Sequence, residues 1–113
     1  MANMILNIPK DFSRSPGARY PSEGDDSGQE FRERLLSPKV KEAIDAGVQL
    51  KVILDGSAGY STSFIEESFG GLVREGKYTL EQLRNTLILV SEEDPSYIDD
   101  IQRYMQNAWD NRR

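Results

Sequence analysis

Apolar residues gather in three short stretches that have the composition of β-strands. Residues 48–54 alternate along the chain, with Lys51 and Ile53 opposite a row of apolar side chains at Val48, Leu50, Val52 and Leu54. Residues 4–8 are mostly apolar and stop at Pro9, which has no amide hydrogen for a sheet. Residues 86–90 form the third stretch. Each stretch predicts one strand.

Helical periodicity occupies the segments between and after these strands. Residues 27–46 begin with Ser27 and Glu30, which match a capping box in which each side chain bonds to the other residue's amide. The Ser37-Pro38 step either kinks this segment or starts a second helix at a proline. The segment therefore predicts one or two helices.

Three further segments also predict helices, at residues 61–75, 79–84 and 94–111. In the first of them, Gly70 and Gly71 each cost about 1 kcal/mol relative to alanine. Such a pair indicates that another part of the chain approaches this backbone closely, and we expect that part to be the sheet.

Strands and helices alternate along the chain. This alternation is typical of an α/β domain with at least one parallel pair of strands and right-handed crossovers. At 113 residues the chain is long enough for one domain and too short for two. We expect a single domain over residues 1–113, with a small mixed sheet of three to five strands packed with three to four helices.

The net charge and the residue types that the chain lacks exclude several classes of partner, ligand and reaction. The net charge of −5 disfavours nucleic acid and anionic membranes as partners. The absence of Cys and His excludes disulfides, thiolate or imidazole metal ligands, and nucleophile-base pairs built on them. No long apolar run occurs, and residues 1–8 lack the features of a signal peptide. We expect a cytoplasmic protein without metal or cofactor, and its oligomeric state stays open.

Two segments match enzyme motifs in part. Residues 59–63 resemble the strand-to-helix turn that holds the serine of some hydrolases, but the chain has no His to act as the base. Residues 71–78 approach a phosphate-binding loop but end in Tyr78, where a Ser or Thr would be needed for Mg²⁺. We therefore expect a protein that is not an enzyme.

Residues 10–26 form a long polar loop. The loop holds Lys10, Arg14 and Arg19 against one early acid, Asp11, and long loops in small domains are often functional. One function hypothesis is therefore a domain that binds a small ligand or nucleotide, with Arg14 and Arg19 clamping a nucleotide or phosphorylated metabolite against the amides near Ser27 or Ser61.

The pairs of acidic residues and the aromatic residues at helical spacing have structural interpretations that need no functional site. The pairs Asp25-Asp26, Glu66-Glu67 and Asp99-Asp100 are predicted to lie on solvated surfaces, because neighbours on a helix point about 100° apart. The aromatic residues Tyr97, Tyr104 and Trp109 keep helical spacing and are predicted to pack on the core.

The corner after the central predicted strand holds three consecutive hydroxyl residues, Ser61, Thr62 and Ser63. A helix that starts there presents free amides and about half a positive charge, so a hydroxyl can be a simple cap. The same physics makes the corner receptive to a phosphate, whether bound or covalently attached. A phosphorylation switch is therefore possible at this corner.

This region also resembles a known family. The matching residues of the central motif are Leu54-Asp55-Gly56, Gly59-Tyr60, Ser61-Thr62-Ser63-Phe64, Glu66-Glu67 and Phe69-Gly70-Gly71-Leu72. Upstream matches are Phe12-Ser13, Pro16-Gly17, Arg19-Tyr20, Ser27-Gly28 and Phe31-Arg32. Together they resemble the STAS-like domains of unknown function, which are distant relatives of the anti-sigma-factor antagonists.

The resemblance implies a non-enzymatic regulatory module that binds a histidine-kinase-like (GHKL) ATPase, which phosphorylates a serine at this helix start. Carried onto this chain, Ser63 matches the phosphorylated serine best, and Thr62 and Ser61 are the other candidates. The implied partner-binding residues are Asp55, Tyr60, Glu66 and Glu67. Phe64, which follows the hydroxyl residues, is expected to pack inward.

Overall fold

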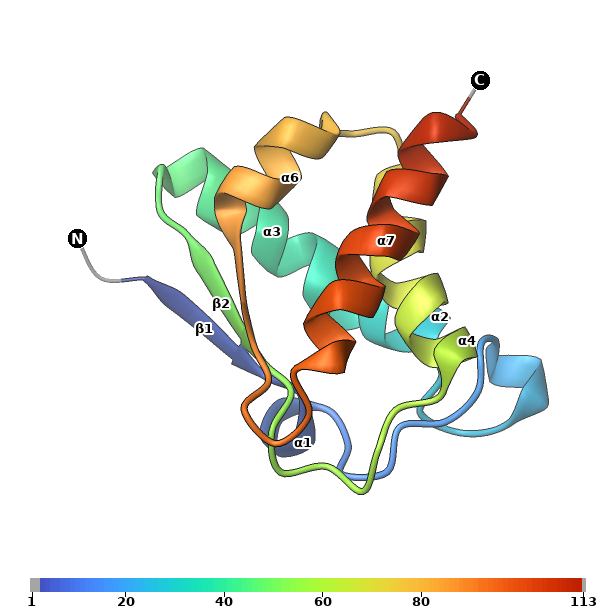
Figure 1. Cartoon of the computed structure of the whole chain (residues 1–113). Coiled ribbons are helices and arrows are strands. Elements are labelled where there is room, and N and C mark those ends of the chain that lie inside the picture. Colours follow the sequence, from blue (N-terminus) through green and yellow to red (C-terminus); the bar gives the residue numbers. More distant parts are fainter. Residues whose placement is uncertain (1–2, 113) are drawn as a thin grey trace.

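Three parallel strands form the sheet, in the order β1, β2, β3 (Figure 1). The computed structural model describes residues 3–112. The strands are β1 (Met4–Asn7), β2 (Leu50–Ile53) and β3 (Leu87–Val90). The expected α/β class is confirmed, and the sheet, which we expected to be mixed, is parallel throughout these residues because a helical connection joins each strand to the next. The domain expected over residues 1–113 includes residues 1, 2 and 113, which lie outside the described residues.

The connection from β1 to β2 contains one long helical segment. Its elements are α1 (Ile8–Asp11), η1 (Pro21–Glu23), α2 (Gly28–Phe31), η2 (Arg32–Leu36) and α3 (Ser37–Ala46). The backbone stays helical from residue 28 to residue 46, and we call this stretch the 28–46 helix. The irregularity predicted at Ser37-Pro38 takes the form of the π-helical turn η2, which ends at Leu36, since proline has no amide to donate.

The remaining helices follow the predicted segments closely. After β2 come α4 (Thr62–Ile65), η3 (Glu66–Gly70) and α5 (Gly71–Arg74), which run on as one stretch that we call the 62–74 helix. Next come α6 (Leu80–Thr86) and, after β3, α7 (Ser96–Asp110). Thr79 and Gln82 form the predicted capping box of α6. The predicted helices at 61–75, 79–84 and 94–111 are confirmed within one or two residues at most ends.

All three strands are shorter than predicted, mostly because neighbouring helices take their end residues; Thr86, the predicted start of the third strand, ends α6. The Asn7 side chain caps the turn α1 by accepting the Lys10 amide at 3.0 Å, so Ile8 starts a helical turn instead of ending β1. The Val48 amide donates to the Ala43 carbonyl at 3.0 Å and still belongs to the end of α3. The loop predicted over residues 10–26 therefore contains the end of α1 and the short helix η1.

The core lies between the sheet and the helices, which cover one face of it (Figure 1). Inward-facing strand residues such as Leu6, Leu50 and Val52 are fully buried. The aromatic residues Tyr97, Tyr104 and Trp109 of α7 are partly buried against this core, which confirms that prediction. No helix among the described residues is long and apolar enough to cross a membrane.

Phe64 packs inward, as expected, and lies in an aromatic cluster beneath the start of the 62–74 helix. Its ring centroid is 5.6 Å from that of Phe31, 5.9 Å from Tyr60 and 6.2 Å from Phe12. The cluster thus joins the polar loop, the 28–46 helix and the 62–74 helix. It positions the corner that carries the three hydroxyl residues.

Candidate functional site

The chain leaves β2 through a corner that is hydrogen-bonded to the loop after β3. The Asp55 carboxylate accepts the amides of Glu92 and Glu93 at 3.0 and 2.8 Å. The Glu93 carboxylate in turn accepts the Gly56 amide at 2.7 Å. Gly56 has φ +98°, a conformation that residues with a Cβ rarely adopt. Asp55, expected to contact a partner, therefore holds two loops together.

Tyr60 closes the same corner from inside. Its hydroxyl donates to the Leu54 carbonyl at 2.7 Å, and its amide donates to the Tyr97 hydroxyl at 3.1 Å. The two tyrosine rings meet edge to face at 5.2 Å. Burial raises the pKa of Tyr60 to about 12, so the phenol stays protonated and can donate. Tyr60 is thus only partly accessible to a partner.

A small cavity of about 180 Å³ lies where these two loops meet, at the carboxyl ends of β2 and β3. Its lining includes Asp55, Tyr60, Ser91, Glu93 and Tyr97. Ligands of open α/β sheets commonly bind at this end of the strands. Here the cavity is below the usual volume of small-molecule sites, roughly 300–1,000 Å³.

The three hydroxyl residues lie at the start of the 62–74 helix, and they are not sealed beneath other side chains. Ser61 is the N-cap, and its hydroxyl accepts the Phe64 amide at 3.0 Å and donates to the Gly17 carbonyl at 3.3 Å. Ser61 and Thr62 are exposed, and Ser63 is partly buried. The first amides of the helix, at Thr62 and Ser63, have no acceptor within it. The corner therefore offers hydroxyls and free amides to the same exposed region.

The polar loop lies beside this helix start and extends the exposed surface. The Ala58 amide donates to the Arg14 carbonyl at 2.7 Å, next to the bond between Ser61 and Gly17. The loop is also joined to α2, where the Gly28 amide donates to the Ala18 carbonyl at 2.8 Å. Arg14 is exposed. Arg14 to Gly17 and Ser61 to Ser63 thus form one continuous surface, which we call the hydroxyl surface.

The three residues named by the ligand-binding hypothesis lie in different environments. Ser27 is fully buried, and its hydroxyl caps α2 by accepting the Glu30 amide at 3.1 Å. The Glu30 carboxylate pairs with Arg34, so only one half of the predicted capping box forms. Arg19 pairs with Glu66 and with Glu67. Of the three residues proposed to hold a ligand, only Arg14 points its charge to solvent.

Glu66 and Glu67 belong to a network of three arginines and three glutamates. The prediction that this pair lies on a solvated surface was wrong, because arginines from other segments of the chain reach both carboxylates. Arg19 bonds to Glu66, and Arg74 bonds to the same carboxylate at 2.6 and 3.1 Å. Glu67 is only 7% exposed and bonds to Arg32.

Arg32 is the central cation of this network. Its guanidinium donates to the Glu67 carboxylate, to the Glu67 carbonyl at 2.8 Å and to the Glu75 carboxylate at 2.9 Å. Burial alone lowers the pKa of an arginine, but the bonds to Glu67 and Glu75 outweigh it and raise the pKa of Arg32. Glu66 and Glu67, expected to contact a partner, are therefore largely occupied within the chain.

The ion pairs of Glu66 predict that the stability of the protein depends on pH. Burial raises the pKa of its carboxyl, but hydrogen bonds from Arg74 and Arg19 outweigh burial and hold the pKa below the usual value. A carboxyl with a lowered folded-state pKa contributes stability above its unfolded-state pKa, about 4.3, and loses it as the pH falls through the folded-state pKa. Between about pH 5 and pH 3, urea titrations should show the free energy of unfolding falling more steeply for the wild type than for Glu66→Gln. Parallel curves would contradict this assignment.

The glycine pair serves this network and not the sheet. A Cβ on Gly71 would overlap the Arg32 guanidinium, and a Cβ on Gly70 would overlap the Glu66 carboxylate. Close packing against the sheet was therefore a wrong prediction. Gly28 marks a second close approach, because its Cβ would lie 2.7 Å from the Phe64 carbonyl oxygen. The glycines thus indicated a helix-helix contact and the room needed by an arginine.

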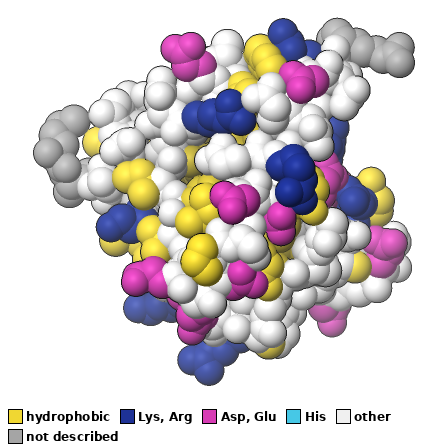
Figure 2. Space-filling model, in the orientation of Figure 1, with side chains coloured by type: hydrophobic (Ala, Val, Ile, Leu, Met, Phe, Trp, Pro, Cys, Tyr) yellow, Lys and Arg dark blue, Asp and Glu magenta, His cyan; other side chains and the backbone are white. Residues whose placement is uncertain are grey.

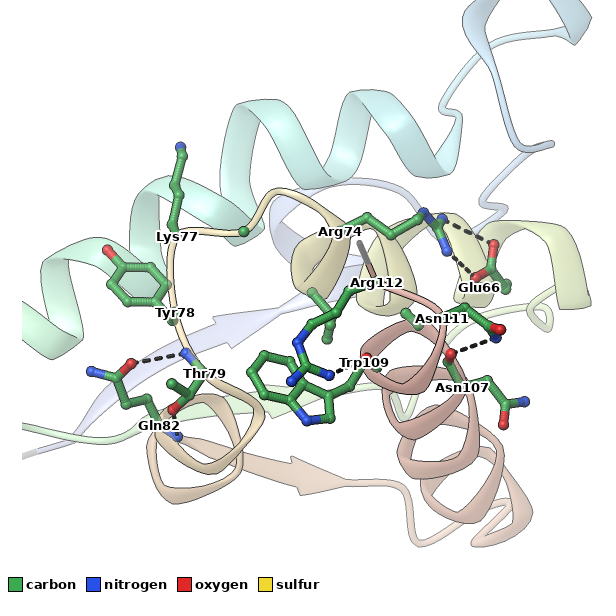
Figure 3. Close-up of a pocket in the computed structure, with 13 residues that line it drawn as sticks. Glu66, Arg74, Lys77, Tyr78, Thr79, Gln82, Asn107, Trp109, Asn111 and Arg112 are labelled. Atoms are coloured by element: carbon green, nitrogen blue, oxygen red, sulfur yellow. Dashed lines mark hydrogen bonds and ion pairs between the residues drawn. The ribbon is translucent and has the colours of Figure 1, made fainter.

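A further cavity of about 740 Å³ opens beside the far end of the 62–74 helix (Figure 3). Its walls include Trp109, over whose ring the Arg112 guanidinium lies at 3.4 Å, and Arg74 paired with Glu66. In Figure 3 the Lys77 side chain points away from these groups. Among the predicted site residues, only Glu66 reaches this cavity. Within the described chain, no cluster of three or more acidic side chains is arranged to hold a metal ion.

Comparison with known proteins gave one match. Residues 27–97 match the model of a family described as a STAS-like domain of unknown function, which covers more than half of the chain. The resemblance expected from the sequence is confirmed. No curated protein and no solved structure gave a significant match. The matched stretch contains β2, β3, the Arg32 and Glu67 pair, and the helix start at Ser61 to Ser63.

Proposed function

The chain belongs to the family of STAS-like domains of unknown function, and on this premise we propose that it is a regulatory module that binds a histidine-kinase-like ATPase through the hydroxyl surface. The observation that supports the proposal most directly is the exposure of Ser61 and Thr62 at the start of the 62–74 helix. A kinase can reach hydroxyls there without unfolding the domain. Phosphorylation of this surface by the bound ATPase then controls the binding.

The three hydroxyls differ in their availability. The Ser61 oxygen serves as the helix cap, and a phosphate on it would displace the bond from the Phe64 amide. Ser63 matches the modified position of the related antagonists and is partly buried, whereas Thr62 is exposed. We therefore place modification on Ser63 first and on Thr62 second.

Electrostatics explain how a phosphate would change binding. A phosphate adds a charge of about −1.5 to −2 to the hydroxyl surface. The first amides of the helix stabilise that charge within the domain, so the fold tolerates the modification. An acidic partner surface would instead meet a like charge, and binding would weaken. The domain keeps its structure, while the affinity of the hydroxyl surface for the partner falls.

The proposal is tested with the histidine-kinase-like ATPases encoded in the same genome, each purified and incubated with this protein and ATP. We expect one of them to attach a phosphate that tandem mass spectrometry places on Ser63 or Thr62. The same ATPase should bind the Ser63→Asp variant about tenfold more weakly than the wild type, because the added charge mimics part of the phosphate. Ser63→Ala should bind like the wild type and lose the modification at that position.

Two control variants separate modification from effects on the fold. Ser96→Ala removes an exposed hydroxyl at the start of α7 that is not part of the hydroxyl surface and bonds to Asp94, and it should change neither binding nor phosphate transfer. Ser61→Ala removes a cap and should lower the free energy of unfolding by about 1 kcal/mol whether or not a switch exists. Equal binding of Ser63→Asp and the wild type by every ATPase, with no phosphate transferred, would refute the proposal.

A further inference from the structure

The face of the sheet turned away from the helices carries two rows of side chains that cross all three strands. The strand register places Ile5, Lys51 and Ile88 in one row, and Asn7, Ile53 and Val90 in the next. These residues alternate with the buried ones that face the helices. In Figure 1 the long helices all lie on the other side of the sheet. We call these six residues the open face.

The open face is mostly apolar, and its residues are partly buried except for Ile5, which is exposed. Four of its six residues are Ile or Val, and Ile5 is 58% exposed, more than any other large hydrophobic side chain in the described structure. Figure 2 shows hydrophobic side chains gathered over β1 and β2. Parallel sheets almost always have both faces covered, because their strands are apolar on both sides. One layer of the usual three-layer arrangement is therefore missing here.

A lysine stands in the middle of this apolar face. Lys51 lies on the central strand between Ile5 and Ile88, and it takes part in none of the ion pairs formed within residues 3–112. A carboxylate placed opposite the Lys51 ammonium would form an ion pair with it, in a region from which binding of the partner excludes water. The face is thus complementary to an apolar surface that contains one acidic group.

The dimensions of the open face fit one helix. Three strands spaced about 4.8 Å apart span about 10 Å, and four residues of strand span about 13 Å. A helix is about 10 Å wide and covers 13 Å with roughly nine residues. A stable dimer needs roughly 20–30 residues on each side, far more than this face offers. A two-fold dimer centred on the face would also bring both copies of Lys51 together, which like-charge repulsion disfavours.

We propose that the open face binds an amphipathic helix of a partner protein, with two to three turns of apolar stripe and an Asp or Glu opposite Lys51. The bound helix would supply the missing layer of the α/β sandwich. This surface is separate from the hydroxyl surface and goes beyond the proposed function, because it needs neither an ATPase nor a phosphate.

The probes are cross-linked helical peptides of about 14 residues, long enough to span the face. All have the same apolar stripe, and one position within the stripe is Glu, Gln or Lys. Amide resonances of the full-length protein are followed as each peptide is added. The Glu peptide should shift resonances of β1, β2 and β3, and the Lys peptide should bind about tenfold more weakly. With Lys51→Glu, the preference between the two peptides should reverse.

Matched variants make the test specific. Lys41→Glu changes the net charge equally but lies on α3, where Lys41 pairs with Asp45, and it should leave the preference unchanged. Ile5→Asp should abolish binding, whereas Tyr20→Asp, at the other exposed large hydrophobic, should not. Both positions are exposed, so the fold should survive.

Three results would overturn the proposal. One is the absence of shifts in the strands with every peptide, and another is binding that does not depend on the charge of the peptide. The third is self-association in which the strand resonances move with protein concentration, which would assign the face to a second copy of the chain.

Discussion

Replacing Phe64 by alanine should lower the free energy of unfolding by about 3 to 5 kcal/mol, the usual loss for a large buried aromatic side chain. Phe64 has no solvent exposure and touches three other aromatic rings, those of Phe12, Phe31 and Tyr60. A domain of this size has a total stability of roughly 5–15 kcal/mol, so this single change removes much of it. Urea unfolding followed by circular dichroism and by the fluorescence of Trp109, the only tryptophan, measures the loss.

The control for this prediction lies two residues away. Thr62→Ala removes an exposed side chain from the same turn of helix and should change the stability by no more than about 0.5 kcal/mol. Phe64→Leu keeps most of the apolar volume and should cost less than alanine does. Similar losses for Thr62→Ala and Phe64→Ala would show that the aromatic cluster does not anchor this helix start.

The aromatic cluster also explains why the polar loop is placed beside the helix start. Phe12 lies near the start of the polar loop, and its ring lies 5.3 Å from Phe31. Backbone hydrogen bonds then join the loop to Ala58 and Gly28. The loop and the Ser61 corner, which carry the two function hypotheses drawn from the sequence, therefore form one surface. The contacts that join them span more than 40 residues, and no local pattern predicts them.

Local signals in the sequence predicted the elements well. Thr79 with Gln82 and Ser61 at its N-cap position form the caps that their spacing indicated, because capping depends on residues within one turn. The alternation along β2 placed Lys51 on the side opposite Leu50 and Val52, which the structure confirms. Whether that side is covered is a property of the whole fold. The bare open face could not be predicted from the alternation alone.

The acidic pair shows where local reasoning fails. Glu66 and Glu67 lie on a helix, and adjacent helical acids usually face water. The structure instead surrounds them with Arg19 and Arg32, which lie 47 and 35 residues earlier in the chain. Gly71 was the available signal, since it leaves room for the Arg32 guanidinium. The sequence alone indicates that some group lies close to the backbone at Gly71, but it does not identify that group.

Breaking the pair between Arg32 and Glu67 should destabilise the protein more than removing the pair entirely. The two side chains are 11% and 9% exposed. Without Arg32, the Glu67 carboxylate keeps only the longer ion pairs to Arg19 and Arg74, at 3.5 and 3.6 Å, so a nearly buried charge loses its closest partner. Arg32→Met should therefore lower the free energy of unfolding by about 3 kcal/mol. In the double variant Arg32→Met with Glu67→Met, both charges are replaced by apolar chains, and we expect at least half of the loss to be recovered.

The comparison needs an exposed pair of the same chemistry. Arg34 and Glu30 lie on the same helix, and Arg34 is 63% exposed, so Arg34→Met should cost about 0.5 kcal/mol or less. Unfolding in urea measures the free energy of unfolding of each variant. If the double variant is as unstable as the sum of its two single variants, the charges of Arg32 and Glu67 act independently. The network would then not be what holds the 28–46 helix to the 62–74 helix beneath the proposed phosphorylation site.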